Sequence, residues 1–184
     1  TLNKVKKYSS STPLVYGGGI NSFNEANKVI KEGADRILVE QLLNNYIELS
    51  KIFENIGAQS LIFSLPLLVK NKKIYQFNYF KNSVFPLSND ILKTIEKNFA
   101  SEILLIDYIN EGSPEKYNDK IIDLFPIKSV PIIAFGGIGL NNINKILLKK
   151  NVNAVAIGNV LNYSENSIRN IKSNYQNLLR YNYI

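Results

Sequence analysis

The sequence contains neither cysteine nor histidine among its 184 residues. Without cysteine there is no disulfide framework and no thiolate chemistry, which favours a cytoplasmic protein. Without histidine, general acid–base work must fall to Asp, Glu, Lys or Tyr, and a zinc site built on His or Cys is excluded. Any catalysis by this chain therefore depends on its carboxylates, amines and phenols.

Long apolar runs are also absent, since none approaches the roughly 18 residues of a membrane span. The chain is 45% hydrophobic and 20% charged, which is typical of one globular domain, here residues 1–184. The net charge is +7. Its lysines are scattered over helix-like segments and form no basic stripe interleaved with aromatic residues. We therefore expect solvated surface and no nucleic-acid or membrane partner.

Short apolar runs alternate with segments of helical periodicity. The runs are 13–17, 36–40, 60–65, 102–109, 130–136 and 154–158. Continuous apolarity is typical of parallel strands covered on both faces. Helices are predicted over 24–32, 47–55, 89–98, 116–124 and 141–149. This alternation predicts an α/β protein with a parallel sheet, and residues 67–80 predict a hairpin with Lys70–Lys73 at its tip.

A long internal repeat runs through the chain. A shift of 118 residues superimposes "PLVYGGGI" at Pro13 on "PIIAFGGI" at Pro131 and relates residues 13–40 to 131–158 without a gap. Four strand–helix units separate the copies, which indicates a duplicated half of a (β/α)8 TIM barrel. A doubly wound open sheet is the alternative, although it seldom preserves such a register.

Six strand–helix units account for strands 3 to 8 of such a barrel. Residues 1–11 read as the helix that precedes the first of them. At this unit length, two further units of roughly 50–65 residues would belong upstream. We therefore expect this chain to be part of a longer polypeptide, or another chain to close the barrel.

Glycines follow several of the predicted strands. In a TIM barrel, ligands bind at the carboxyl ends of the strands, and phosphate commonly binds after strands 7 and 8. Glycine lets backbone N–H groups approach an anion there. The pairs Gly18–Gly19, Gly136–Gly137 and Gly158–Asn159 thus predict two phosphate sites for a ligand phosphorylated at both ends. The alternative is that these glycines only form tight turns.

Four stretches carry a family resemblance: "PLVYGGGINSFNEANKVIKEGADRILVE", "GAQSLIFSL", "SEILLIDYINEGS" and "VPIIAFGGIG". They resemble the cyclase subunit of imidazole glycerol phosphate synthase, and "PLVYGGGI" is also similar to paralogues found with surface-polysaccharide amidotransferases. The resemblance implies a lyase of histidine biosynthesis that acts on a doubly phosphorylated ribulosyl aminoimidazole substrate. It also implies ammonia supplied by a glutaminase subunit, and neither a metal nor a redox cofactor.

The resemblance implies roles for individual residues and marks where this chain departs from the family. Of the family's two catalytic aspartates, one lies in the segment this chain lacks and the other falls on Pro66, which has no proton to titrate. Glu111, after strand 6, and Glu40, after strand 4, are then the candidate catalytic residues. Gly112 and Ser113 join the candidate phosphate-binding residues.

At the opposite ends of the strands, the resemblance places the family's charged ammonia gate on Arg36 and Glu102, with Asp35 on the glutaminase-facing rim. The alternative for Arg36 and Glu102 is an ion pair that only stabilises the strand starts. For the whole chain, the alternative function is a catalytically impaired scaffold that docks a glutaminase, conducts ammonia or binds phosphate. A decayed gene product without a role of its own is the third possibility.

Overall fold

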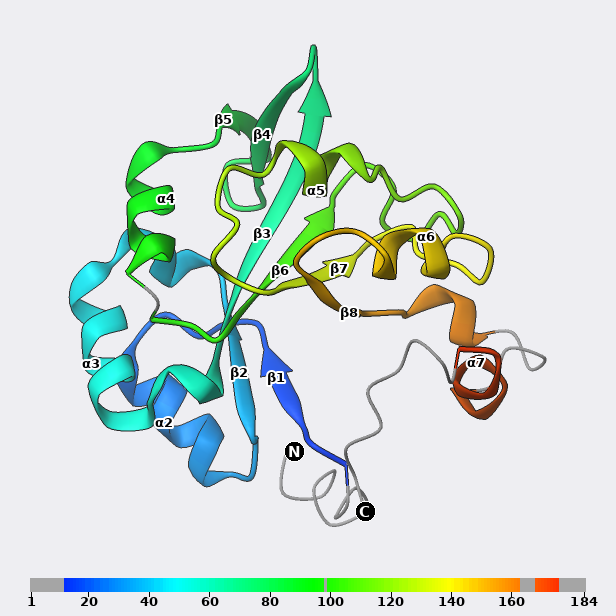
Figure 1. Cartoon of the computed structure of the whole chain (residues 1–184). Helices are drawn as coiled ribbons and strands as arrows, with labels where there is room; N and C mark the ends of the chain where they lie inside the picture. The colour runs from blue at the N-terminus through cyan, green and yellow to red at the C-terminus, as the bar shows by residue number, and fades with distance from the viewer. Residues whose placement is uncertain (1–11, 98, 163–167, 176–184) are drawn as a thin grey trace. The chain divides into compact units, whose positions relative to one another are not determined.

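A computed structural model describes residues 12–97, 99–162 and 168–175. The helix expected within residues 1–11, and Asn98 at the end of another expected helix, lie outside the described residues. Strands and helices alternate along the chain (Figure 1). In the described part, no helix has the length and apolarity to cross a membrane.

Among the described residues, eight strands belong to one sheet. They are β1 (Val15–Gly17), β2 (Arg36–Val39), β3 (Leu61–Lys70), β4 (Lys73–Asn78), β5 (Ser83–Pro86), β6 (Glu102–Asp107), β7 (Ile132–Phe135) and β8 (Val152–Val155). The order is β1-β2-β3-β6-β7-β8, with β4 paired to β3 and β5 paired to β4. The pairs β1–β2, β2–β3 and β7–β8 are parallel.

This order places β7 four strands after β1, in agreement with the 118-residue offset of the repeat. The helix-linked parallel strands confirm the predicted fold class, part of a (β/α)8 TIM barrel.

Helices follow most of the strands. They are α2 (Phe23–Lys31), α3 (Tyr46–Ile56), α4 (Asn89–Glu96), α5 (Lys120–Leu124), α6 (Ile143–Leu147) and α7 (Ile168–Asn174), with short 3-10 turns η1 (Gln41–Asn44), η2 (Ala58–Ser60) and η3 (Asn159–Asn162). Polar side chains cap helices α2, α3 and α4 at their N-termini. Ser22, Asn45 and Ser88 each accept a hydrogen bond from a backbone N–H in the first turn.

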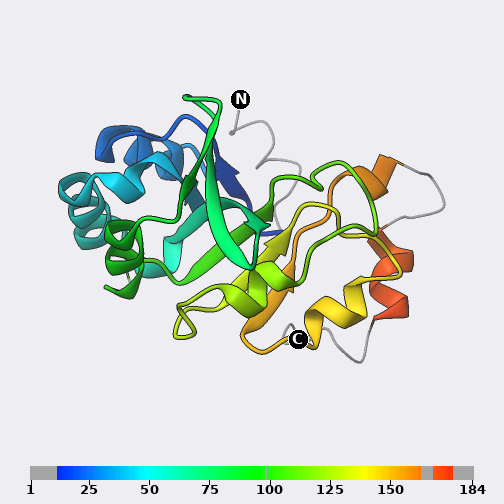
Figure 2. The same ribbon diagram turned by 90° about the horizontal axis from the view of Figure 1, so that it is seen from above.

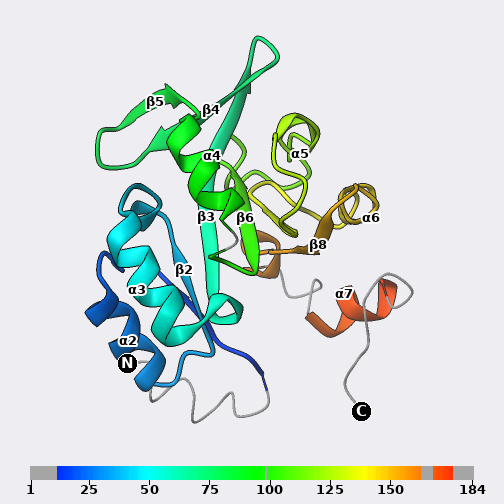
Figure 3. The ribbon, with the colours of Figure 1, turned by 60° about the vertical axis from the view of Figure 1, so that its left-hand side comes forward.

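The chain forms two compact units, and the first comprises Thr1–Leu65, Pro86–Leu104 and Ile127–Pro131. Within it, α2 and α3 pack side by side, and α2 also contacts β2 (Figures 1 and 3). In Figure 2 these two helices are the neighbouring blue and cyan ribbons. On β2, Ile37 and Val39 are fully buried, whereas Arg36 and Leu38 are half-buried. This alternation is the period of a strand with two different faces.

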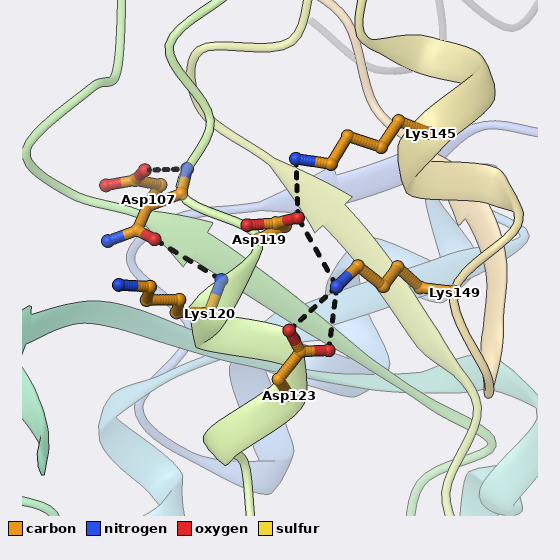
Figure 4. Close-up of polar contacts among 7 residues, drawn as sticks. Asp107, Asp119, Lys120, Asp123, Lys145 and Lys149 are labelled. Atoms are coloured by element: carbon orange, nitrogen blue, oxygen red, sulfur yellow. Dashed lines mark hydrogen bonds and ion pairs between the residues drawn. The ribbon is translucent and has the colours of Figure 1, made fainter. Parts of the chain in front are cut away.

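The second unit comprises Pro66–Phe85, Leu105–Pro126 and Ile132–Ile184, so β3 and β6 contribute residues to both units. Its core includes buried Ile132 and Ala134 of β7, Phe125 after α5, and Ile146 of α6. Helices α5 and α6 lie side by side (Figure 3) and are joined by ion pairs from Lys145 and Lys149 to aspartates of α5 and its N-cap (Figure 4).

The predicted hairpin is confirmed. Strand β3 continues to Lys70, which pairs with Lys73 at the start of β4. The tip residues Asn71 and Lys72 have φ values of 51° and 59°, the left-handed conformations that a two-residue hairpin turn requires. Strand β5, which pairs with β4, was not predicted.

Two predicted helices are shorter than expected. Residues 116–124 and 141–149 show the helical period, but α5 begins at Lys120 and α6 at Ile143. The Asn142 side chain bonds to the backbone of Gly137 and Gly139 and leaves the helix N–H groups uncapped. Asparagine side chains that bond nearby backbone compete with helix formation, which explains the shortening of α6.

Candidate functional site

Three loops of the second unit meet at one pocket. Its lining includes six of the predicted phosphate-binding residues, namely Gly112, Ser113, Gly136, Gly137, Gly158 and Asn159. These residues follow β6, β7 and β8 in pairs, so widely separated parts of the sequence converge here. The pocket is a small hollow that is partly open to solvent.

Hydrogen bonds between the loops fix the walls of this pocket. The Tyr117 backbone N–H donates to the Gly137 carbonyl over 3.0 Å. Asn159 Nδ2 donates to the Gly112 carbonyl over 2.9 Å. The Asn159 side chain therefore joins the loops after β6 and β8, so its amide group serves the architecture of the pocket.

Glu115 provides a further link between two of these loops. Both of its carboxylate oxygens lie 3.1 Å from the Asn141 backbone nitrogen, whose N–H they accept. Glu115 has a φ of 66°, which is uncommon for a residue with a side chain. The loop after β6 thus adopts a strained conformation that brings this carboxylate to the loop after β7.

The backbone requires glycine at some positions of the pocket but not at others. Gly136 and Gly137 have φ values of +93° and +76°. A Cβ at Gly136 would lie 2.6 Å from the Asp107 carbonyl oxygen, and one at Gly137 would lie 2.9 Å from the Asn110 oxygen. Both glycines are therefore required by the turn and its neighbours. A Cβ at Gly158 would meet only Phe135, at 3.9 Å, so the fold does not require glycine there.

The repeat-related glycines adopt the same local conformation in the first unit. Gly18 and Gly19 have φ values of +104° and +70°, close to those of Gly136 and Gly137. A Cβ at Gly18 or Gly19 would meet nothing within 4 Å. The turn is thus repeated, but the close packing around it is not.

The pocket beside Gly18 and Gly19 has mixed charge. It is lined in part by Glu25, Lys28 and Glu32 of α2 and its C-cap, and its empty volume is about 530 Å³. Two carboxylates and one ammonium group surround a site that was predicted to bind phosphate. Repulsion from the carboxylates disfavours an anion here.

Glu111 lies exposed in the loop after β6, next to the pocket residue Gly112. Tyr79 Oη donates to Glu111 Oε2 over 3.5 Å. Tyr79 contacts the rings of Phe77 and Tyr108, which stack with their centroids 3.7 Å apart. An aromatic cluster therefore supports the position of the Glu111 carboxylate.

Glu40 lies at the carboxyl end of β2, in the first unit, whereas Glu111 belongs to the second unit. Burial raises the pKa of Glu40 to about 7, and a hydrogen bond from Gln41 opposes this shift. A carboxyl that titrates near neutral pH suits general acid–base chemistry.

The two residues of the predicted gate form an ion pair. An Arg36 Nη1 proton is donated to Glu102 Oε2, and Arg36 also donates to Ser101 Oγ and, over 3.0 Å, to the Gln59 carbonyl. These side chains are 25% and 19% exposed, and their partners satisfy a partly buried charge at the strand starts. Asp35 Oδ2 accepts the Leu14 backbone N–H over 2.7 Å and so anchors the chain entering β1.

Pro66 is buried within β3. The ladder from β2 ends at Phe63 and the ladder from β4 begins at Leu67. Proline lacks a backbone N–H and is tolerated at such an interruption between ladders. Proline has no carboxylate, so the position that the resemblance aligns with a catalytic aspartate carries no acidic side chain in this chain.

Sequence reasoning missed Asp107 and Tyr117. Asp107 is 1% exposed and was read only as part of an apolar strand. The Tyr117 hydroxyl is buried without a hydrogen-bond partner among the described residues. Burial, followed by the charges of Asp107 and Asp119, raises the pKa of Tyr117 above its ordinary range. An acidic residue ending an apolar run was the available signal for Asp107.

A family profile described as histidine biosynthesis protein matches residues 2–167. The chain belongs to the histidine biosynthesis protein family. Its relatives include proteins named imidazole glycerol phosphate synthase subunit HisF. The one from Chlorobium limicola is 28% identical over 94% of this chain and 71% of its own length. The one from Dictyoglomus thermophilum is 28% identical over 87% and 65%, and that from Prochlorococcus marinus subsp. pastoris is 29% identical over 90% and 68%.

These identities make this chain a divergent member of the histidine biosynthesis protein family, similar to subunit HisF. The predicted resemblance is confirmed at this level. The family membership agrees with the helix-linked parallel strands of the structure.

Gly137, which the turn requires, and Gly158, which it does not, should differ in their effect on stability when replaced. Gly137→Ala should lower the free energy of unfolding by about 1–3 kcal/mol, because alanine is strained at positive φ and its Cβ would clash with backbone. Gly158→Ala should change it by less than about 0.5 kcal/mol. Urea unfolding of both variants measures the difference, and equal losses would contradict the distinction between these glycines.

Glu40 should make stability depend on pH. Its pKa is raised from 4.5 to about 7 in the folded state, so the folded chain holds a proton that the unfolded chain releases. The contribution of Glu40 is fully present below pH 4.5 and is lost as the pH rises to about 7. Glu40→Gln should therefore gain stability relative to the wild type across this window, as measured by urea midpoints.

Glu48→Gln is the control for Glu40. A hydrogen bond from Lys51 lowers the pKa of Glu48, so removing that carboxylate should lower relative stability at neutral pH and have less effect in acid. If the Glu40→Gln midpoints ran parallel to those of the wild type at every pH, Glu40 would have an ordinary pKa.

Proposed function

We propose that this chain is an enzyme of the cyclase type, a lyase that acts on a phosphorylated ribulosyl aminoimidazole substrate with ammonia from a glutaminase. The products would be imidazole glycerol phosphate and an aminoimidazole ribotide, as in the cyclase family that the sequence resembles. The observation that carries the proposal is the convergence of the loops after β6, β7 and β8 on one glycine-lined pocket.

The pocket supports the phosphate part of this proposal. Phosphate commonly binds after the seventh and eighth strands of a TIM barrel, and β7 and β8 correspond to those strands. None of the lining residues carries a carboxylate, so the pocket wall itself places no like charge against a bound anion. The pocket is small, so the remainder of the substrate would extend out of it.

Two carboxyl groups support the chemical part. Glu111 adjoins the pocket residue Gly112, where it would act on a substrate whose phosphate is bound. Glu40 has a pKa of about 7, which allows a carboxyl to donate and accept protons at neutral pH. Glu111, or alternatively Glu40, would take over the role of the family aspartate that falls on Pro66.

The names of the relatives support a partner. Each of the three relatives is called a synthase subunit, and a glutaminase is the partner that the family resemblance implies. The charged residues Arg36 and Glu102 lie at the amino ends of β2 and β6, opposite the strand ends that carry Glu40 and Asp107. They would form the ammonia entrance, with Asp35 on the docking rim.

A second function is favoured by Pro66. Buried proline at the position of a catalytic carboxylate removes one proton-transfer group. A chain that had lost catalysis could still bind phosphate and dock a glutaminase through Arg36, Glu102 and Asp35. This scaffold would bind the phosphorylated substrate without converting it.

Phosphate binding is the first test. Isothermal titration of the chain with inorganic phosphate should detect binding in the millimolar range. Gly158→Val should abolish it, because the fold tolerates a side chain at Gly158 but its methyl groups would occupy the pocket. Gly158→Ala is the matched control and should retain most of the affinity. Absence of binding by the wild type at millimolar phosphate would remove the pocket from the proposal.

Turnover separates the enzyme from the scaffold. With ammonium and the ribulosyl aminoimidazole substrate, Glu111→Gln should lower kcat by about 100-fold or more, the usual size of a lost acid–base group. Glu96→Gln, an exposed change on α4, should have no effect. Unchanged kcat in Glu111→Gln would exclude Glu111 from the mechanism, and phosphate binding without wild-type turnover would favour the scaffold.

A further inference from the structure

Asp107 ends β6 and is almost completely buried, with 1% of its surface exposed. Three donors surround its carboxylate. The Asn110 backbone N–H and Nδ2 donate over 3.3 and 2.8 Å, and the Asn118 backbone N–H donates over 2.7 Å. Because a buried charge needs such partners, Asp107 ties together the two ends of the loop formed by residues 110–118.

The same residue also contacts the loop after β7 through its main chain. A Cβ at Gly136 would lie 2.6 Å from the Asp107 carbonyl oxygen, which shows how closely the two backbones approach. At the next residue, the Gly137 carbonyl accepts the Tyr117 backbone N–H over 3.0 Å. The end of β6 and the loop that it closes therefore lie directly against the glycine turn of the pocket.

The far end of the 110–118 loop has a second, weaker anchor (Figure 4). Asp119 lies 2.8 Å from Lys145 Nζ and 3.3 Å from Lys149 Nζ of the α6 region. The Lys145 side chain is 69% exposed, and exposed ion pairs contribute little to stability. Lys149 is 24% exposed but divides its ammonium group between Asp119 and Asp123. The buried hydrogen bonds of Asp107 are therefore the stronger constraint on the loop.

We propose that Asp107 is a positioning residue for the phosphate pocket. It closes the 110–118 loop so that Gly112 and Ser113, near the middle of the loop, reach the pocket wall. Asp107 is not among the residues that line the pocket, so its charge does not contact the anion. The inference rests on the proposed phosphate-binding function of that pocket.

The test is Asp107→Asn in the full chain, titrated with inorganic phosphate. An asparagine amide would turn an N–H group toward the donors of Asn110 or Asn118, which the loop accommodates only by opening. Phosphate should bind about tenfold more weakly, the size expected for one lost buried hydrogen bond. By NMR, the amide signals of Gly112 and Ser113 should lose their phosphate-dependent shifts.

Asp123→Asn is the matched control, because it makes the same chemical change outside the 110–118 loop. Asp123 belongs to α5, and its carboxylate lies 2.7 Å from Lys149 Nζ. The Asp123 side chain is 50% exposed, so the change should affect the melting temperature little and leave phosphate affinity unchanged. Equal weakening by Asp107→Asn and Asp123→Asn would reduce Asp107 to a stabilising residue and overturn the inference.

Asn110→Ala removes one of the three donors and keeps the test valid if Asp107→Asn does not fold. It should weaken phosphate binding by a smaller factor. Wild-type affinity in Asp107→Asn, or in Asn110→Ala where the former does not fold, would overturn the positioning role while leaving the proposed function intact. Failure of the wild-type chain to bind phosphate would instead overturn the proposed function.

Discussion

The pocket depends on one close contact between backbones. Gly136 and Gly137 lie so near the end of β6 and its loop that a Cβ at either position would be within 3 Å of backbone atoms. Positive φ at both residues turns the chain sharply after β7. This turn lets the loop after β6 approach, where Tyr117 and Asn159 link the three loops by hydrogen bonds. Removing this contact would separate the walls of the pocket.

A repeated turn did not produce a repeated site. Gly18 and Gly19 match the conformation of their counterparts 118 residues later, yet their surroundings are open. Backbone conformation follows from the local sequence, which the repeat preserves. Packing follows from neighbouring loops, which differ between the copies. The charges differ as well, because Glu25 and Glu32 line the pocket beside Gly18, so only the later copy combines a tight turn with an uncharged lining.

The sequence predicted strands better than helices and hydrogen-bonded loops. Apolar runs located the parallel strands because burial on both faces leaves a continuous signal. Periodicity overestimated α6, because Asn142 bonds to the preceding turn instead of capping a helix. The roles of Asp107 and Asn118 were not predictable, because the hydrogen bond between residues eleven positions apart exists only after the loop closes. Gly112 was predicted as a phosphate-binding residue through the family resemblance and Gly158 through the barrel geometry, and the structure brings both to one pocket.

The acidic residues Asp107 and Glu40, at the ends of β6 and β2, differ in how many hydrogen bonds their carboxyl groups accept. This difference distinguishes a structural carboxylate from one that can take part in proton transfer. Asp107 is buried and accepts three hydrogen bonds, so its charge is balanced within the fold. Glu40 is only half-buried, but a single side-chain donor, Gln41, opposes the desolvation that raises its pKa to about 7. A fully bonded carboxylate holds its neighbours in place, whereas an under-bonded one exchanges protons near neutral pH. Of these two acids, Glu40 is therefore the one whose pKa would suit proton transfer, and Asp107 is the one whose hydrogen bonds hold the loop after β6.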